Sequence, residues 1–178
     1  MLTGGCFCGH VRYAADAPAF HETVCHCTDC RRAVGAAPVA WFSVPRAALR
    51  FTAGESASFR SSAQVTRRFC GRCGTSLTYE SDRHPDEVDV TICSLDDPNA
   101  LPPKDHVQVA TKLHWTLLCD GLPAYDGWRP EAVHAFTDNV LVSTPACVLF
   151  AFATPVFARG RLEGGPARRQ ACRSHYEV

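Results

Sequence analysis

The chain has 178 residues and is 46% hydrophobic, which is enough for one ordinary domain with a proper core. Basic and acidic residues balance at 18 each, so no net field favours nucleic acid or an anionic membrane as a partner. The first cysteine motif begins only three residues into the chain, which leaves no room for a secretory signal. We therefore expect a cytoplasmic protein, in which reduced cysteines bind metal rather than form disulfides.

In chain order, the predicted elements are short and β-rich. One helical turn or two is predicted at 28–34, and no segment before residue 115 sustains a long apolar repeat of 3.6 residues. Apolar runs and period-two alternation, broken by turn residues such as Pro45 and Gly54, predict the strands. The predicted fold class is mainly β, with short antiparallel strands, and the predicted strands cover 39–44, 49–52, 57–60, 75–79, 87–92 and 106–110.

The character of the chain changes beyond about residue 136. A strongly apolar run at 140–158 is followed by a polar, basic stretch at 159–173. Two prolines interrupt the apolar run, so we do not expect a membrane helix there. A strand pair packed on the domain and a poorly ordered tail both remain open. The sequence thus predicts a zinc-binding domain over 3–136 and an extension over 137–178 without an assigned role.

Seven of the eleven cysteines fall into three tight clusters. Cys70 and Cys73, with a glycine after each, form a zinc knuckle, because glycine permits the positive φ angles of a tight turn. This pair needs two further ligands, and Cys6 and Cys8 are the natural suppliers. Such a four-cysteine site is closed and structural, and it would join the N-terminus to the middle of the chain. Two unrelated pairs of reduced cysteines are the alternative.

The third cluster places Cys25, Cys27 and Cys30 within six residues. Three thiolates can hold zinc and leave one position open, which is the arrangement of catalytic sites. Zinc in such a site acts as a Lewis acid and lowers the pKa of a bound water or thiol. A bound thiol then becomes a thiolate that stays nucleophilic at neutral pH. We therefore predict that these three cysteines are catalytic.

Residues beside this cluster have two interpretations each. His26 lies between two ligand cysteines, and we expect it to point away from the metal rather than bind it. Asp29 orients a ligand or caps the helical turn. Arg31 and Arg32 steer an anionic substrate or are solvated surface charges. Outside the clusters, we expect Cys93 to be a small buried residue of an apolar strand.

These motifs resemble the glutathione-dependent formaldehyde-activating enzyme family, which also contains centromere protein V-like proteins. The resemblance covers roughly residues 3–128, and its cysteine skeleton is highly specific. It depends on GGCFCGHVRY at 4–13, CHCTDCRR at 25–32, FCGRCGTSLTY at 69–79, SLDDP at 94–98, His106, Trp115 and GLP at 121–123.

The resemblance implies an Mss4-like fold with two zinc ions. A structural ion would be held by Cys6, Cys8, Cys70 and Cys73, and a catalytic ion by Cys25, Cys27 and Cys30. The family's named activity joins glutathione to formaldehyde, and its members are usually classed as carbon–sulfur lyases. Relatives often have glycine and threonine where this chain has Cys93 and Ser94, so the substrate is less certain than the metal scaffold.

Three functions follow from these observations. The leading one is a zinc-dependent carbon–sulfur lyase that acts on an aldehyde adduct of glutathione or another small thiol. The second is a non-catalytic, zinc-stabilised interaction module, which the open three-cysteine site disfavours. The third is a thiol redox protein using Cys27 and Cys30, and the missing βαβ pattern argues against it. The sequence predicts no nucleic-acid or membrane partner and leaves the oligomeric state open.

Overall fold

Ten strands and one α-helix form the part of the chain that the computed structural model describes, residues 1–130. Four short 3₁₀ turns, at Arg46–Ala48, Ile92–Ser94, Pro98–Ala100 and Val109–Thr111, connect some of these elements. In chain order the elements are β1 (Leu2–Gly5), β2 (Arg12–Ala15), β3 (Phe20–Cys25), α1 (Thr28–Val34), β4 (Val39–Pro45), β5 (Leu49–Ala53), β6 (Ala57–Ser62), β7 (Val65–Phe69), β8 (Ser76–Ser81), β9 (Glu87–Thr91) and β10 (Asp105–Val107).

The mainly β class and the single helix at 28–34 are confirmed. Five predicted strands correspond to β4, β5, β6, β8 and β9. The sixth, predicted at 106–110, ends at Val107, because Gln108 takes a left-handed conformation with φ of 60° and a 3₁₀ turn follows. The predicted extension at 137–178, with its apolar run, lies outside the described residues.

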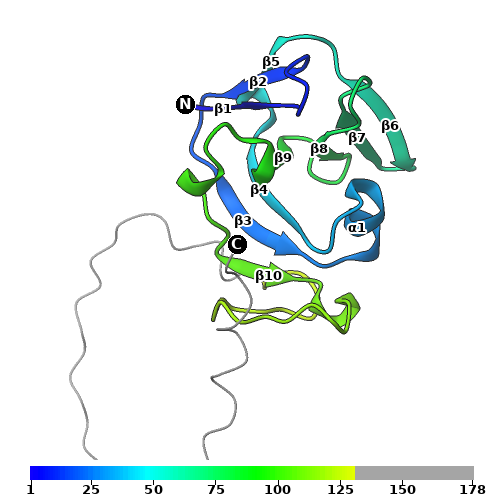
Figure 1. Cartoon of the computed structure of the whole chain (residues 1–178), viewed down its shortest axis with the longest axis vertical. Coiled ribbons are helices and arrows are strands. Elements are labelled where there is room, and N and C mark those ends of the chain that lie inside the picture. The colour runs from blue at the N-terminus through cyan, green and yellow to red at the C-terminus, as the bar shows by residue number, and fades with distance from the viewer. Residues whose placement is uncertain (131–178) are drawn as a thin grey trace, which may run out of the picture. The chain divides into compact units, whose positions relative to one another are not determined.

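The strands form two sheets (Figure 1). A three-stranded sheet has the order β1-β2-β5, and a seven-stranded sheet has the order β10-β3-β4-β9-β8-β7-β6. Neighbouring strands in both sheets pair antiparallel, except that β10 lies parallel to β3. The prediction of antiparallel strands therefore holds for every described pair but that one.

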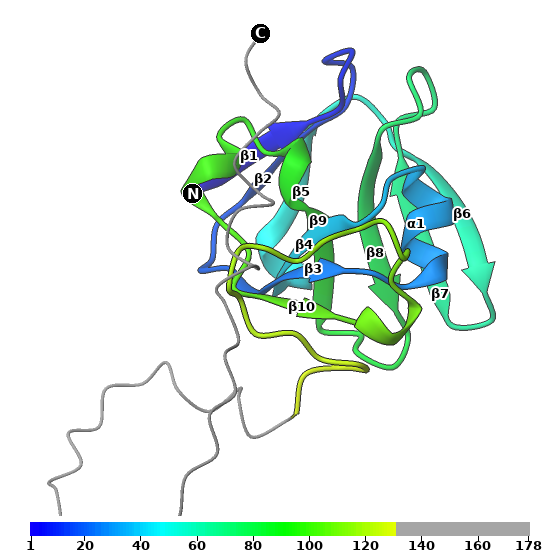
Figure 2. The ribbon, with the colours of Figure 1, turned by 60° about the horizontal axis from the view of Figure 1, so that its bottom comes forward.

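Each face of the seven-stranded sheet buries its own core. On β4, Phe42 and Val44 point into a core shared with Tyr13 of the small sheet, while Trp41 points to the opposite face. The second core is smaller and contains two cysteines, Cys25 and Cys30. Figures 1 and 2 show α1 beside the β6–β8 end of this sheet, and β10 at its other edge.

Register places one row of side chains across the second face, because directly opposite residues of antiparallel strands point the same way. This row runs from β4 to the edge strand β6, and its members are Ser43, Asp89, Tyr79, Arg67 and Phe59.

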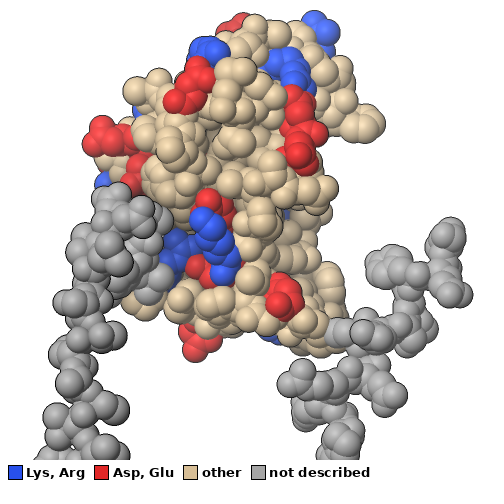
Figure 3. Space-filling model, turned by 90° about the vertical axis from the view of Figure 1, so that its left-hand side faces the viewer, with Lys and Arg blue, Asp and Glu red and all other residues tan. Residues whose placement is uncertain are grey.

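Charges on the surface of the described part are mixed in sign. Figure 3 shows lysine and arginine next to aspartate and glutamate on one face. Among the described residues, exposed ion pairs such as Arg60–Asp82 at 2.7 Å bring opposite charges together. No helix within residues 1–130 is long and apolar enough to cross a membrane.

Candidate metal centres and the adjoining groove

The four-cysteine cluster, made of Cys6, Cys8, Cys70 and Cys73, joins two equivalent turns. Cys6 and Cys8 lie between β1 and β2, and Cys70 and Cys73 lie between β7 and β8. In each turn a glycine with positive φ follows the second cysteine and donates its backbone N–H to the carbonyl of the first: Gly9 to Cys6 at 3.0 Å, and Gly74 to Cys70 at 2.9 Å.

The sulfur positions of this cluster fit a zinc ion. A tetrahedral site with Zn–S bonds of about 2.3 Å places its sulfurs about 3.8 Å apart. The Sγ of Cys8 lies 3.5 Å from that of Cys6 and 3.8 Å from that of Cys70, and all four sulfurs lie within 4.8 Å of one another. Cys6 and Cys70 are buried in the main core, so a metal here would be part of that core.

Polar groups around two of the four sulfurs, those of Cys6 and Cys73, favour thiolates, the form that binds metal. The backbone N–H of Val11 donates to the Sγ of Cys6 at 3.2 Å. Hydrogen bonding with the Thr75 side chain, at 3.2 Å, lowers the pKa of Cys73 to about 5. The cluster therefore has the donor set and the local environment of a structural zinc site.

The three-cysteine cluster, made of Cys25, Cys27 and Cys30, sits where β3 passes into α1. Cys25 ends β3, Cys27 is the N-cap of α1, and Cys30 belongs to its first turns. The three sulfurs lie within 4.8 Å of one another, and no other histidine, cysteine or acidic ligand atom of residues 1–130 joins them. Cys25 and Cys30 are buried, whereas Cys27 is partly exposed. An ion bound here would thus face outward on the side of Cys27.

Helix geometry and electrostatics both single out Cys27. Its Sγ accepts the backbone N–H of Cys30 at 3.2 Å, which is the hydrogen bond that begins the helix. Hydrogen bonds from the Cys25 and Cys30 thiols lower the pKa of Cys27 to about 2. The hydrogen bond with Cys27 in turn raises the pKa of Cys25. The three sulfurs are therefore close enough to one another to share a metal ion.

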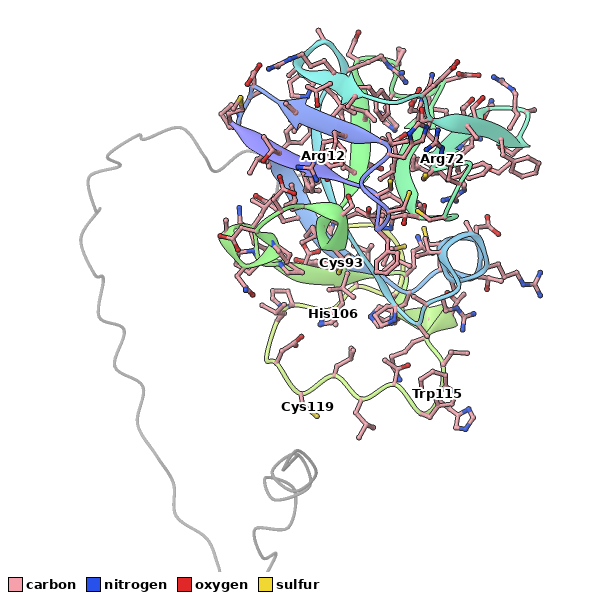
Figure 4. All side chains as sticks on the ribbon, turned by 45° about the horizontal axis from the view of Figure 1, so that its top comes forward. Arg12, Arg72, Cys93, His106, Trp115 and Cys119 are labelled. Atoms are coloured by element: carbon pink, nitrogen blue, oxygen red, sulfur yellow. The ribbon has the colours of Figure 1, made fainter. Side chains whose placement is uncertain are left out.

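His26 does not belong to this cluster. Its Nε2 lies 3.0 Å from the Nδ1 of His106, whose Nε2 lies 2.8 Å from a carboxylate oxygen of Asp120 (Figure 4 labels His106). Burial lowers the pKa of His26, which favours its neutral ring, and the two histidines form a hydrogen-bonded chain that ends at Asp120. The expectation that His26 avoids the metal thus agrees with the geometry. In the sequence, His106 stood out only as part of the family resemblance. Its pairing with His26 was not predicted, because 80 residues separate the two histidines.

A groove of about 710 Å³ lies between α1 and strands β6–β8. Tyr79 lines the groove and also packs against the core that contains Cys25 and Cys30, so the groove adjoins the three-cysteine cluster. Its lining residues are Asp29, Arg32, Ala33, Ser58, Phe59, Ser61, Ser62, Val65, Arg67, Arg68, Phe69, Gly74, Ser76 and Tyr79.

The charged residues after the cluster have different surroundings. Asp29 lies in the first turn of α1 and lines the groove, whereas the N-cap is Cys27 and not Asp29. The guanidinium of Arg31 donates to the Thr28 hydroxyl at 3.2 Å. Arg32 is exposed on the groove wall, and no carboxylate of the described residues pairs with it.

Cys93 is exposed, and the expectation of a buried strand residue was wrong (Figure 4). Strand β9 ends at Thr91, and the 3₁₀ turn Ile92–Ser94 sends Ile92 and Ser94 inward and the Cys93 thiol outward. Cys119 is also exposed, and neither residue joins a metal cluster.

Comparison with known proteins gives the family. Among curated proteins, none matches this chain. One matching crystal structure is titled as a Rhodobacter sphaeroides protein, Northeast Structural Genomics target RhR83; it is 21% identical, covers 69% of this chain and 98% of that one, and has a TM-score of 0.48. The family model described as glutathione-dependent formaldehyde-activating enzyme matches residues 1–111, which include all seven clustered cysteines. The chain therefore belongs to the glutathione-dependent formaldehyde-activating enzyme family.

Proposed function

We propose that this protein is a cytoplasmic, zinc-dependent carbon–sulfur lyase that makes or breaks the adduct between a small thiol, such as glutathione, and formaldehyde or a related aldehyde. Family membership supports this proposal. The observation that carries it is the three-cysteine cluster, which offers three sulfurs and no fourth ligand within the described residues. A site of this kind has room for a substrate.

The two clusters have separate roles in this proposal. The four-cysteine cluster holds a structural zinc ion, because its buried members belong to the main core and its turns come from distant parts of the chain. The three-cysteine cluster holds a catalytic zinc ion, because it adjoins a groove and its Cys27 is partly exposed. Zinc at this position supplies an open site that favours the thiolate form of a thiol.

The proposed reaction forms or breaks one C–S bond and transfers one proton between sulfur and oxygen. In the synthetic direction the thiol sulfur adds to the aldehyde carbon, the C=O electron pair moves to oxygen, and the thiol proton ends on that oxygen. In the reverse direction the C–S bond breaks and the proton returns to sulfur. This chain's contribution is to keep the thiolate beside the aldehyde and to limit water around both, which the buried Cys25 and Cys30 and the ring of Tyr79 support.

The experiment is an exchange measurement on the zinc-loaded full chain. Nuclear magnetic resonance with ¹³C-formaldehyde and glutathione gives the rate of adduct formation and cleavage with and without protein. We expect acceleration by the wild type, loss of acceleration in Cys27→Ser, and retention in Cys93→Ser, whose thiol is exposed and outside both clusters.

X-ray absorption at the zinc edge is the companion measurement. With clusters of four and three sulfurs, the average sulfur count per zinc lies between three and four and should rise when glutathione is added. If the count equals four without thiol and no acceleration is seen, the three-cysteine site is closed. The interaction-module function then replaces the lyase.

A further inference from the structure

The groove beside the three-cysteine cluster carries an excess of positive charge. Arg32 projects from α1, and Arg67 and Arg68 come from β7 on the opposite wall. Arg68 has an ion-pair partner, because its Nε lies 2.7 Å from the Glu80 carboxylate, which also pairs with Arg46. Asp29 is the one acidic residue among the lining residues. Two arginines without an ion-pair partner within the described residues therefore face the same groove.

The Arg67 side chain is fixed by its neighbours, but its hydrogen-bonding capacity is not fully used. Only 7% of the residue is exposed, its Nε donates to the Ser61 hydroxyl at 3.3 Å, and its guanidinium carbon lies 4.9 Å from the centre of the Tyr79 ring. Its Nη1 is buried and has no hydrogen-bond acceptor. Asp89 belongs to the same cross-strand row, two strands away, but makes no ion pair with it.

A buried charged donor without an acceptor is costly, and it is uncommon in native proteins. An incoming anion would remove that cost, which gives the guanidinium a reason to turn toward the groove when an anion binds; side-chain reorientation of this kind is common on binding. Arginine is also suited to carboxylates, because its planar fork can donate two parallel hydrogen bonds.

We propose that Arg67 is the carboxylate-binding residue of this groove, assisted by Arg32 on the opposite wall, so that the thiols this protein accepts are thiols that also carry a carboxylate. The inference rests on the proposed function, since it assumes that the thiol binds at the three-cysteine cluster. Tyr79 contacts Arg67 and also packs against the core that contains Cys30, so the carboxylate and thiol positions both lie next to Tyr79.

The test compares two thiols of the same size, one with a carboxylate and the other with a neutral amide in its place. Calorimetry on the zinc-loaded full chain, at low ionic strength, gives dissociation constants for 3-mercaptopropionate and its neutral amide. A hydrogen bond to a charged group contributes about 1.5–3 kcal/mol, so we expect the wild type to prefer the carboxylate by about 10- to 100-fold.

Substitutions of groove residues test whether the preference for the carboxylate thiol arises in the groove. Arg67→Met should bind both thiols with similar affinity, and Arg67→Lys should keep part of the preference, because it retains the charge but not the fork. Arg32→Gln should reduce the preference without risk to folding, because Arg32 is exposed. The matched control is Arg60→Gln, which removes an exposed arginine of β6 that pairs with Asp82 instead of lining the groove.

The outcomes separate the inference from the proposed function. If the wild type binds both thiols equally, or if Arg67→Met and Arg32→Gln keep the full preference, the carboxylate site is refuted and the lyase stands. If neither thiol binds to the zinc-loaded protein, the proposed function fails and takes the inference with it. A preference lost in Arg67→Met, reduced in Arg32→Gln and kept in Arg60→Gln establishes the site.

Discussion

Replacing Cys70 by serine should remove the metal that joins two distant turns and so unfold most of the protein. Cys70 is 0% exposed, and its Sγ lies 3.8 Å from that of Cys8, which is 62 residues away in the chain. A cross-link over a loop of that size restricts the unfolded chain by about 4 kcal/mol. The three cysteines of 25–30 span six residues, and the same relation gives about 2 kcal/mol.

These values are lower limits for the two sites, because they omit the metal–sulfur bonds themselves. Even so, about 4 kcal/mol is a large part of the net stability of a whole domain, which is about 5–15 kcal/mol, whereas about 2 kcal/mol is a smaller part. We expect Cys70→Ser to be largely insoluble or unfolded. Cys27→Ser should stay folded and contain about one zinc ion instead of two.

The assay is zinc stoichiometry on purified protein, followed by urea unfolding monitored by tryptophan fluorescence. Cys93→Ser is the control for the loss of a thiol outside both clusters. A soluble Cys70→Ser protein that keeps all its zinc, with an unfolding free energy within about 1 kcal/mol of Cys93→Ser, would refute the structural role of the four-cysteine cluster.

Two further predictions concern stability and chain length. Burial raises the pKa of Asp89 to about 6, above the unfolded value of about 3.9, so its contribution to stability is full below about pH 4 and is lost as pH rises through 6. Asp89→Asn should therefore be more stable than the wild type by a margin that widens by roughly 1–2 kcal/mol between pH 5 and 7.5 in urea unfolding; a constant margin would contradict this assignment. A protein that ends at Phe136 should stay soluble and keep its full zinc content by metal analysis, because every clustered cysteine precedes residue 74; aggregation or loss of metal would show that the extension completes the fold.

The parts of the molecule that short sequence spacing controls were predictable. The turns that carry the cysteines formed as their spacing indicated, because neighbouring thiols and a following glycine define a tight turn locally. That Cys6 and Cys8 would meet Cys70 and Cys73 came instead from counting the four ligands that a closed zinc site needs. The helix at 28–34 was equally local, since it begins at the Cys27 sulfur cap and ends at Gly35 with a φ of 73°.

Features that depend on distant partners were not predictable. The alternation at 106–110 predicted a strand there, but not that β10 would pair in parallel with β3, about 80 residues earlier. The burial of Arg67 follows from its place in the cross-strand row, while its sequence context of polar and basic residues resembles an exposed strand. Cys93 was misassigned because an apolar run does not reveal where a strand ends and a 3₁₀ turn begins.

The two faces of the seven-stranded sheet also have a consequence for how members of such a family can diverge. Phe42 and Val44 stabilise the sheet against its smaller neighbour, whereas Trp41 and Ser43, one residue along, face the cysteine cluster and the row that ends at the groove. Alternate positions of β4 therefore have different roles: one set packs the two sheets together, and the other set belongs to the face with the cysteine cluster. Substitutions on the groove face can change which ligand the groove accepts while the other face keeps the scaffold intact, so new specificities can arise without a change of fold.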